Sequence, residues 1–224
     1  MIGMASNSLN FGSRPLHQIN LRRGAGEGFV CAVVSELDPK DAEDVAALQK
    51  IAQSWHGAKY AGDILDYFVG NRKPEPMPCE VALYKKSPPV FGYYAVEMSD
   101  KKSLGERIVG LLQTTFKNWY NSPNLEMDYV QTKPDLKFDN GAVRTVKGIG
   151  EILMAKTCDL AKSFGAKDIT IESSNDAFYL NSCKKADIKL LDGQEDDKYG
   201  VFYLQSNDFD KYMKYIEQKY QTKF

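Results

Sequence analysis

The sequence predicts a single α+β domain with a mixed central sheet flanked by helices. Three observations predict this fold class. Residues 79–132 form a block of short β-rich segments separated by turn residues. Residues 124–174 then place a strand, a glycine-containing turn, a helix and a second strand in succession. No linker or shift in composition divides the 224 residues, which are enough to bury the core of one domain.

The first 28 residues are polar and become rich in glycine, so we expect a flexible lead-in over residues 1–28. Their last segment, "RRGAGEG", has the composition of a phosphate-binding loop. Such a loop normally follows a strand and opens a helix, whereas this one precedes a predicted strand at residues 29–37. We therefore place the start of the domain, residues 29–205, after it.

Two helices are expected next. The segment "DPKDAEDVAALQKIAQSW" offers Asp38 as an N-cap and Pro39 in the first turn, and its apolar residues keep helical spacing. A second helix is expected over residues 59–69, and the prolines of "NRKPEPMP" end the helical pattern.

The middle of the chain is predicted to form an antiparallel meander, because its β-rich segments are joined by short turns. Alternating residues or runs of β-formers mark these segments, which we place at residues 79–86, 90–98, 106–116 and 124–132.

The remaining elements alternate between helix and strand. Residues 148–164 carry apolar side chains on one helical face, and Gly165 suits the position that follows a helix. With a strand before and after it, this helix makes a β-loop-α-β unit. The later elements are a strand at 168–174, a helix at 175–186, a strand at 199–205 and an amphipathic helix within the C-terminal segment 206–224.

Composition argues against several classes of function. The net charge of −1 gives no global attraction to nucleic acid. No apolar run is long enough to span a bilayer, and we expect no secretory signal and no membrane partner. The four cysteines are scattered singly and there are only two histidines, so we expect no metal site and a reduced, cytoplasmic compartment.

The segment "TVKGIGEILM" places Gly148 and Gly150 directly before a helix. Glycine lets the backbone approach a ligand closely, and the first amides of a helix lack partners at the positive end of its dipole. The turn can therefore hold a phosphate or pyrophosphate, the alternative being a tight turn without a ligand. Leu153 stands where the dinucleotide fingerprint requires glycine, and Glu151 where the P-loop requires lysine, so neither motif fits.

The stretch "VKGIGEILM", after a strand and a loop, resembles motif A of the GNAT superfamily of N-acetyltransferases, written Arg/Gln-x-x-Gly-x-Gly/Ala. Thr145 occupies the Arg/Gln position, with Arg144 one residue earlier. Residues 173–191 resemble the family's next motif, in which a strand ends in Asn and the following helix carries a Tyr. The resemblance is specific over residues 124–191.

The resemblance implies a sheet splayed beside an acyl-coenzyme A site, with acetyl-CoA as co-substrate and no metal. The strand before the glycine turn would bind pantetheine through its backbone, and the helix amides would hold the pyrophosphate. The implied cofactor-binding residues are Tyr129, Val130, Gln131, Thr132, Thr145, Val146, Lys147, Gly148, Ile149, Gly150, Glu151 and Asn175.

The resemblance also implies transfer of an acetyl group to a primary amine by direct attack, which needs an acid for the departing thiolate. Tyr179 is our candidate acid, and Ser182, three residues later on the same helix, is the alternative. Glu126 and Asp128 alternate on one face of the strand and are candidate bases, a solvated strand face being the alternative.

The expected acceptor is a small-molecule or a peptide or protein amine, and acidic residues such as Asp63 and Asp66 would suit a cationic one. The C-terminal helix either packs on the domain or makes a homodimer contact. Two rival functions stay open: a non-catalytic acyl-CoA-binding regulatory module of the same fold, and a nicotinamide oxidoreductase, which Leu153 disfavours. Cys158 and Cys183 lack a neighbouring histidine and are interpreted as packing residues.

Overall fold

The computed structural model describes residues 14–24, 28–56, 60–73, 76, 78–98, 103–119, 122–134, 146–192 and 200–224. Its strands are β1 (Arg14–Arg23), β2 (Phe29–Glu36), β3 (Val90–Met98), β4 (Ile108–Trp119), β5 (Ser122–Thr132), β6 (Val146–Lys147), β7 (Asp168–Ser173), β8 (Leu191–Asp192) and β9 (Gly200–Gln205). Its helices are α1 (Ala42–Ser54), α2 (Ala61–Phe68), α3 (Val81–Lys86), α4 (Leu104–Arg107), α5 (Ile149–Ser163), α6 (Asp176–Lys185) and α7 (Ser206–Tyr220).

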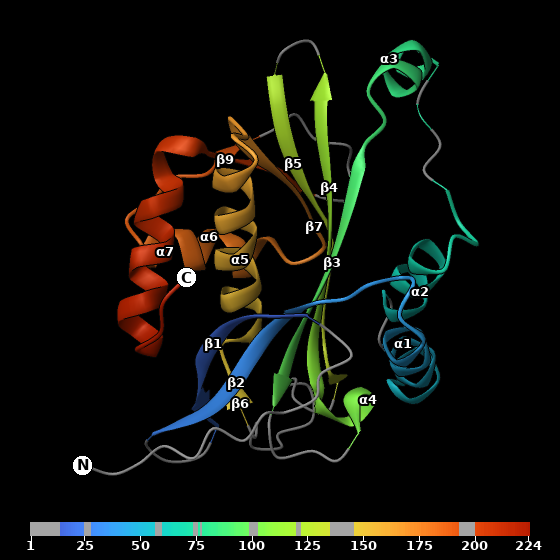
Figure 1. The fold of residues 1–224 in the computed structure, drawn as a ribbon. Helices are drawn as coiled ribbons and strands as arrows, with labels where there is room; N and C mark the ends of the chain where they lie inside the picture. Colours follow the sequence, from blue (N-terminus) through green and yellow to red (C-terminus); the bar gives the residue numbers. More distant parts are fainter. Residues whose placement is uncertain are drawn as a thin grey trace.

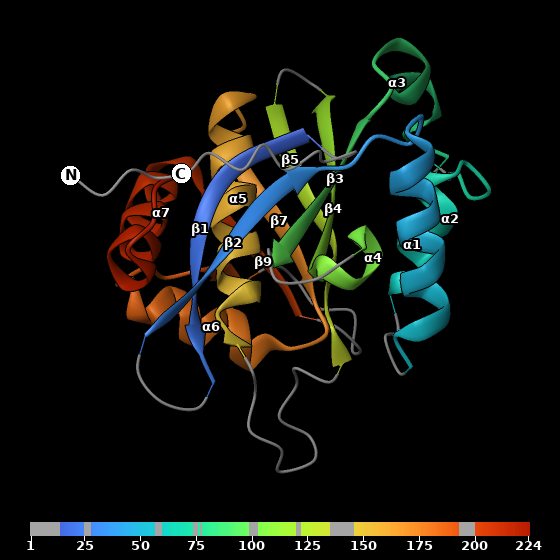
Figure 2. The ribbon, with the colours of Figure 1, turned by 60° about the horizontal axis from the view of Figure 1, so that its bottom comes forward.

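In the described part of the chain, nine strands form one mixed sheet in the order β6-β1-β2-β3-β4-β5-β7-β9-β8. Strands β2 to β5 pair antiparallel in sequence order, which confirms the last three strands of the predicted meander, now β3, β4 and β5. Strands β5 and β7 run parallel and are connected through α5, which confirms the β-loop-α-β unit. Helices α5 and α7 lie on one face of the sheet, and α1 and α2 lie on the other (Figures 1 and 2).

Each face of the sheet has its own core. Side chains of α5 and α7 pack with β1, β5, β7 and β9 in the larger core, whose largest buried side chains include Tyr212 and Tyr220 of α7. The smaller core joins α1 and α2 to β3 and β4. The C-terminal helix therefore packs on the domain, against α5, β1 and β9.

Two expectations about the first half of the chain are wrong. Residues 14–23, placed in the lead-in, form β1, because alternation buries Ile19 and Leu21 against the sheet. Residues 79–86 were expected to be a strand, but Val81–Lys86 form α3. This segment has no partner strand, none of its residues is buried, and Ala, Leu and Lys favour a helix.

The start of α1 also differs from the prediction. Asp41, not Asp38, caps the helix: its side chain accepts hydrogen bonds from the amides of the following turn. Asp38 instead accepts from the amide of Lys40, at 2.8 Å, within the preceding turn. Pro39 consequently lies before the helix rather than in its first turn.

The sheet opens along β5. Strand β5 pairs with β7 only from Asn124 to Met127, although β5 continues to Thr132. On its other side, β5 carries a bulge, because Gln113 of β4 pairs with Tyr129 while the next β4 residue pairs with Met127. Asp128 is therefore the extra residue, and such a bulge bends the strand and re-aims its side chains.

Gly110 of β4 is where the start of α5 meets the sheet. A Cβ atom at Gly110 would lie 2.3 Å from the Cγ2 of Ile149 and 3.3 Å from a methyl of Leu153. The absence of a side chain here lets the glycine turn before α5 lie close to the open end of β5.

Replacing Gly110 with Ala is expected to lower the free energy of unfolding by about 1–3 kcal/mol, because the new methyl overlaps Ile149. Urea denaturation measures the change. Gly62→Ala is the matched control: no atom lies within 4 Å of its Cβ, and on helix α2 it is expected to stabilise by up to about 1 kcal/mol. Equal unfolding free energies for the two variants would contradict this close approach.

Candidate functional site

A cavity of about 730 Å³ opens where β5 and β7 part. The segments that line it include the end of β5, the glycine turn with the start of α5, and the start of α6. The predicted cofactor-binding residues that line it are Val130, Gln131, Thr132, Val146, Lys147, Gly148, Ile149, Gly150, Glu151 and Asn175. Of the remaining two, Tyr129 lines a neighbouring cavity and Thr145 lies outside the described residues.

The two glycines of the turn are required by close packing. Gly148 has a φ of 99°, and a Cβ there would lie 2.3 Å from the hydroxyl of Tyr220 in α7. A Cβ at Gly150 would lie 2.9 Å from the ring of Phe178 in α6. Aromatic rings of two other helices thus press against the turn, which gives the glycines a structural role that does not depend on a ligand.

The charges around the turn favour an anion. The basic residues among those that line the cavity are Arg22, Lys147, Lys185 and Lys219. Glu151 is the acidic one; its carboxylate accepts from the Nζ of Lys219 at 2.6 Å and from the hydroxyl of Tyr220. Lys219 is thus paired with Glu151, and the other basic side chains add positive charge to the amino end of α5, which favours an anion there.

Arg22, Lys185 and Lys219 were missed by the sequence analysis. Arg22 is in a strand that was taken for a lead-in, and Lys219 is on the C-terminal helix. Their shared place in the cavity depends on contacts between residues nearly 200 positions apart, such as the 3.2 Å hydrogen bond from the Arg22 guanidinium to the Lys219 carbonyl oxygen.

The two candidate acids of α6 have different surroundings. Tyr179 is 8% exposed and lines the cavity, and burial raises the pKa of its hydroxyl well above the ordinary range. Ser182 is 2% exposed and hydrogen-bonded, oxygen to oxygen at 2.7 Å, to the buried hydroxyl of Tyr212. Ser182 is therefore part of the packing between α6 and α7, and it does not line the cavity.

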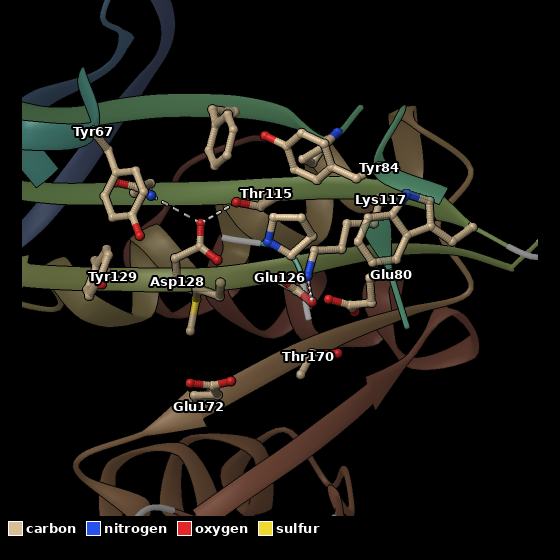
Figure 3. Close-up of a pocket in the computed structure, with 16 residues that line it drawn as sticks. Tyr67, Glu80, Tyr84, Thr115, Lys117, Glu126, Asp128, Tyr129, Thr170 and Glu172 are labelled. Atoms are coloured by element: carbon tan, nitrogen blue, oxygen red, sulfur yellow. Dashed lines mark hydrogen bonds and ion pairs between the residues drawn. The ribbon is translucent and has the colours of Figure 1, made fainter. Parts of the chain in front are cut away.

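A second cavity, of about 270 Å³, lies beside β5 on the side of α2 and α3 (Figure 3). It adjoins the first cavity through a pair of tyrosines. The ring of Tyr129, in the second cavity, lies 5.3 Å from the ring of Tyr60, in the first. A ligand in each cavity would therefore approach the other near the point where the sheet opens.

Both candidate bases line the second cavity. The Oδ2 of Asp128 accepts from the hydroxyl of Thr115 at 2.6 Å and from the Nε2 of Gln113 at 3.4 Å (Figure 3). Burial raises the pKa of Asp128 to about 7. Glu126 accepts from the Nζ of Lys117 at 2.7 Å, and burial raises its pKa too. Neither carboxylate lies on a freely solvated strand face, because both are partly buried and hydrogen-bonded.

Other candidate residues lie outside the two cavities. Cys158 and Cys183 are buried in the larger core, as expected for packing residues. Asp63 is paired with Arg72 at 2.9 Å. Among the described residues, no three His, Cys, Asp or Glu side chains are grouped to hold a metal ion, and none of the helices is long and apolar enough to cross a membrane.

Asp128→Asn is expected to raise the melting temperature at pH 8 and to change it little near pH 4. Because the pKa of Asp128 is raised from 3.8 to about 7, its carboxyl stabilises the folded state at low pH and that stabilisation is lost as the pH rises through about 7. Asn still accepts from Thr115 and carries no charge. Scanning calorimetry at the two pH values measures the difference.

Asp159→Asn is the control of opposite sign. His17 and Lys156 lower the pKa of Asp159 from 3.8 to about 2. The ionised Asp159 carboxylate therefore stabilises the folded state above about pH 4, and this stabilisation is lost as the pH falls through about 2. This control should therefore lower the melting temperature at pH 8. A lower melting temperature for Asp128→Asn at pH 8 would contradict a buried, unfavourable charge at that position.

Comparison with known proteins found no matching family model and no matching curated protein. Solved structures resemble the fold. An uncharacterised protein from Bacillus halodurans is 10% identical, with 92% of this chain and 98% of that chain covered and a TM-score of 0.50. The PaiA N-acetyltransferase from Thermoplasma acidophilum, in complex with coenzyme A, is 13% identical. The match covers 78% of this chain and 98% of that chain, with a TM-score of 0.43.

A tandem GNAT protein from the clavulanic acid biosynthesis pathway is 19% identical over 63% of this chain, with a TM-score of 0.41. The match spans only 36% of that longer chain. At these identities the likeness concerns the fold alone. The mixed sheet, opened beside β5 and followed by a glycine turn that begins α5, has the arrangement expected from the sequence, in which the sheet splays beside the strand before the glycine turn.

Proposed function

We propose that the protein is an acyl-CoA-dependent N-acetyltransferase, which moves an acetyl group from acetyl-CoA to a primary amine by direct attack. One observation carries the proposal: the glycine turn, the open end of β5 and Tyr179 all face one cavity, and the cavity beside it holds Asp128. Candidates for a phosphate site, an acid and a base thus lie in adjoining places beside an open strand edge, which supports the proposal.

The first cavity suits the acyl donor. The pyrophosphate of coenzyme A would accept hydrogen bonds from the first amides of α5, with Arg22, Lys185 and Lys219 near its negative charge. Beyond Met127, the backbone of β5 is not paired with β7, so its N–H and C=O groups can bind the amides of pantetheine as an added strand would. This arrangement would direct the thioester toward the junction of the cavities.

The reaction then needs two proton transfers. The amine nitrogen attacks the thioester carbonyl carbon, and the carbon–sulfur bond breaks. Asp128, with a pKa of about 7, is suited to take the proton from the amine, because a base works best when its pKa is near the operating pH. Tyr179, whose raised pKa keeps it protonated, would donate a proton to the departing thiolate. Coenzyme A then leaves as the thiol, so the proton given to its sulfur matches the proton taken from the amine.

The alternative function is a non-catalytic acyl-CoA-binding module. One observation favours it: packing against Tyr220 and Phe178 alone would require both glycines, so the turn could persist without any chemistry. Both functions need the first cavity, and they differ only in whether acetylated amine is formed.

Tyr179→Phe is expected to lower kcat by about 10²-fold or more, the usual contribution of a general acid, while the affinity for acetyl-CoA stays within about twofold. The assay measures thiol released from acetyl-CoA with a panel of primary amines. Ser182→Ala is the matched control on the same helix, and its kcat should change little, because Ser182 contacts Tyr212 and not the cavity.

Equal loss of kcat in both variants would contradict the assignment of Tyr179. Wild-type protein that binds coenzyme A and acetylates no amine would instead support the binding module.

A further inference from the structure

Polar groups reach the second cavity mainly from the sheet, and apolar rings reach it mainly from the segment between α2 and β3. The sheet supplies groups such as Thr115 on β4 and Asp128 on β5. Residues 67–91 supply Glu80 and five apolar side chains, which belong to Tyr67, Pro76, Tyr84, Pro89 and Phe91. In Figure 3 the rings of Tyr67 and Tyr84 project into the same cavity as the Asp128 carboxyl. A ligand in this cavity would therefore meet a carboxyl and several rings together.

Asp128 has one carboxyl oxygen left for a ligand. Its Oδ2 accepts from Thr115 at 2.6 Å and from Gln113 at 3.4 Å, whereas its Oδ1 accepts no hydrogen bond within the described residues. The side chain is only partly buried, so a donor in the cavity can approach Oδ1. An ammonium group would complete the carboxylate with a charge-assisted hydrogen bond, which is stronger than a neutral one.

The other carboxylates of the cavity do not call for a second cation. Glu126 is ion-paired with Lys117 at 2.7 Å, Glu172 is exposed to solvent, and Glu80 has an interaction of its own. The Nζ of Lys117 also lies 5.0 Å from the centre of the Trp119 ring. The chain itself thus fills this part of the cavity with an ammonium group. A ligand needs only one amine, and its remaining atoms meet the apolar side chains.

Those apolar side chains favour a flat ring. The rings of Tyr67 and Phe91 are stacked, with their centres 6.2 Å apart and an angle of 22° between their planes. The Tyr129 ring lies 6.2 Å from the same Tyr67 ring. Aromatic rings attract one another beyond the apolar area that they bury, because the edge of one ring and the face of another carry opposite partial charges. A saturated ring of the same size lacks this attraction.

We propose that the second cavity binds the acceptor, and that the acceptor is an arylalkylamine. Its single primary amine lies beside Asp128, and a short alkyl chain places its aromatic ring among Tyr67, Tyr84 and Phe91. A cavity of about 270 Å³ is smaller than those that hold drug-sized ligands, and it suits a molecule with one ring better than a peptide. Acetylation of this amine rests on the proposed function, whereas its binding does not.

Isothermal titration calorimetry of the full chain without acetyl-CoA tests the binding. The probes are 2-phenylethylamine, its saturated analogue 2-cyclohexylethylamine, and 2-phenylethanol, which keeps the ring and lacks the amine. At pH 8, above the pKa of about 7 of Asp128, we expect 2-phenylethylamine to bind at least about threefold more tightly than the saturated amine and about tenfold more tightly than the alcohol. An affinity within about twofold of either analogue, or no binding, would overturn the proposal.

Tyr84→Leu tests the place of the ring. No residue of α3 is buried, so this variant should fold, and it should weaken the binding of 2-phenylethylamine about threefold while the saturated amine changes less than twofold. Tyr203→Leu makes the same change at an exposed tyrosine of β9, outside both cavities, and should alter neither affinity. The same preference for the aromatic amine in the two variants would overturn the placement of the ring.

The acetyl-transfer assay keeps the two claims apart. If the protein binds 2-phenylethylamine and acetylates no amine, the proposed function fails and the arylalkylamine site stands. If it acetylates 2-phenylethylamine and 2-cyclohexylethylamine with equal kcat/KM, the proposed function stands and the arylalkylamine site fails. A short peptide with a free amino terminus, included in the panel, overturns the arylalkylamine proposal if its kcat/KM exceeds that of 2-phenylethylamine.

Discussion

The arrangement of both cavities depends on the interruption of strand pairing at one point of β5. Pairing with β7 ends at Met127, and Asp128 is an extra residue against β4. Beyond that point the backbone of β5 is open toward the glycine turn, while the bulge directs Asp128 to the opposite cavity. One local irregularity therefore separates the place we propose for a thioester from the place we propose for an amine, and the two cavities adjoin through Tyr60 and Tyr129.

The rest of the fold holds the helix start against this opening. Gly110 lets α5 approach β4, and Gly148 and Gly150 admit the rings of Tyr220 and Phe178. The same region concentrates features that lower the stability of the fold, including a partly buried carboxyl with a raised pKa at Asp128 and basic groups gathered in one cavity. Unfavourable charge of this kind is typical of functional sites, where the surrounding packing offsets its cost.

Local patterns in the sequence were sufficient for three strands of the meander, the glycine turn and the amphipathic α5, because each depends on residues close in the chain. They also paired Glu126 with Asp128 as candidate bases. They could not reveal the bulge, which depends on the register between β4 and β5. We expected a flexible lead-in because of the glycines after Arg23. That expectation overlooked Ile19 and Leu21, whose alternation with polar residues is typical of a strand.

The sequence could not predict which aromatic residues line the second cavity or which basic residues line the first. These residues come together only through tertiary contacts between distant elements. Tyr67 of α2 stacks on Phe91 of β3, and Tyr129 of β5 packs against Tyr67. The choice between Tyr179 and Ser182 likewise required the position of α7, whose Tyr212 takes up the serine hydroxyl.

The most direct test of a coenzyme A site is thermal melting of the protein with acetyl-CoA, with NAD and ATP as controls. A hundredfold excess of ligand over its dissociation constant stabilises the folded state by roughly 2.7 kcal/mol, which corresponds to a rise of about 5–10 °C in the melting temperature. The account predicts such a rise with acetyl-CoA and a smaller one with either control. No rise with acetyl-CoA, or an equal rise with NAD, would contradict it.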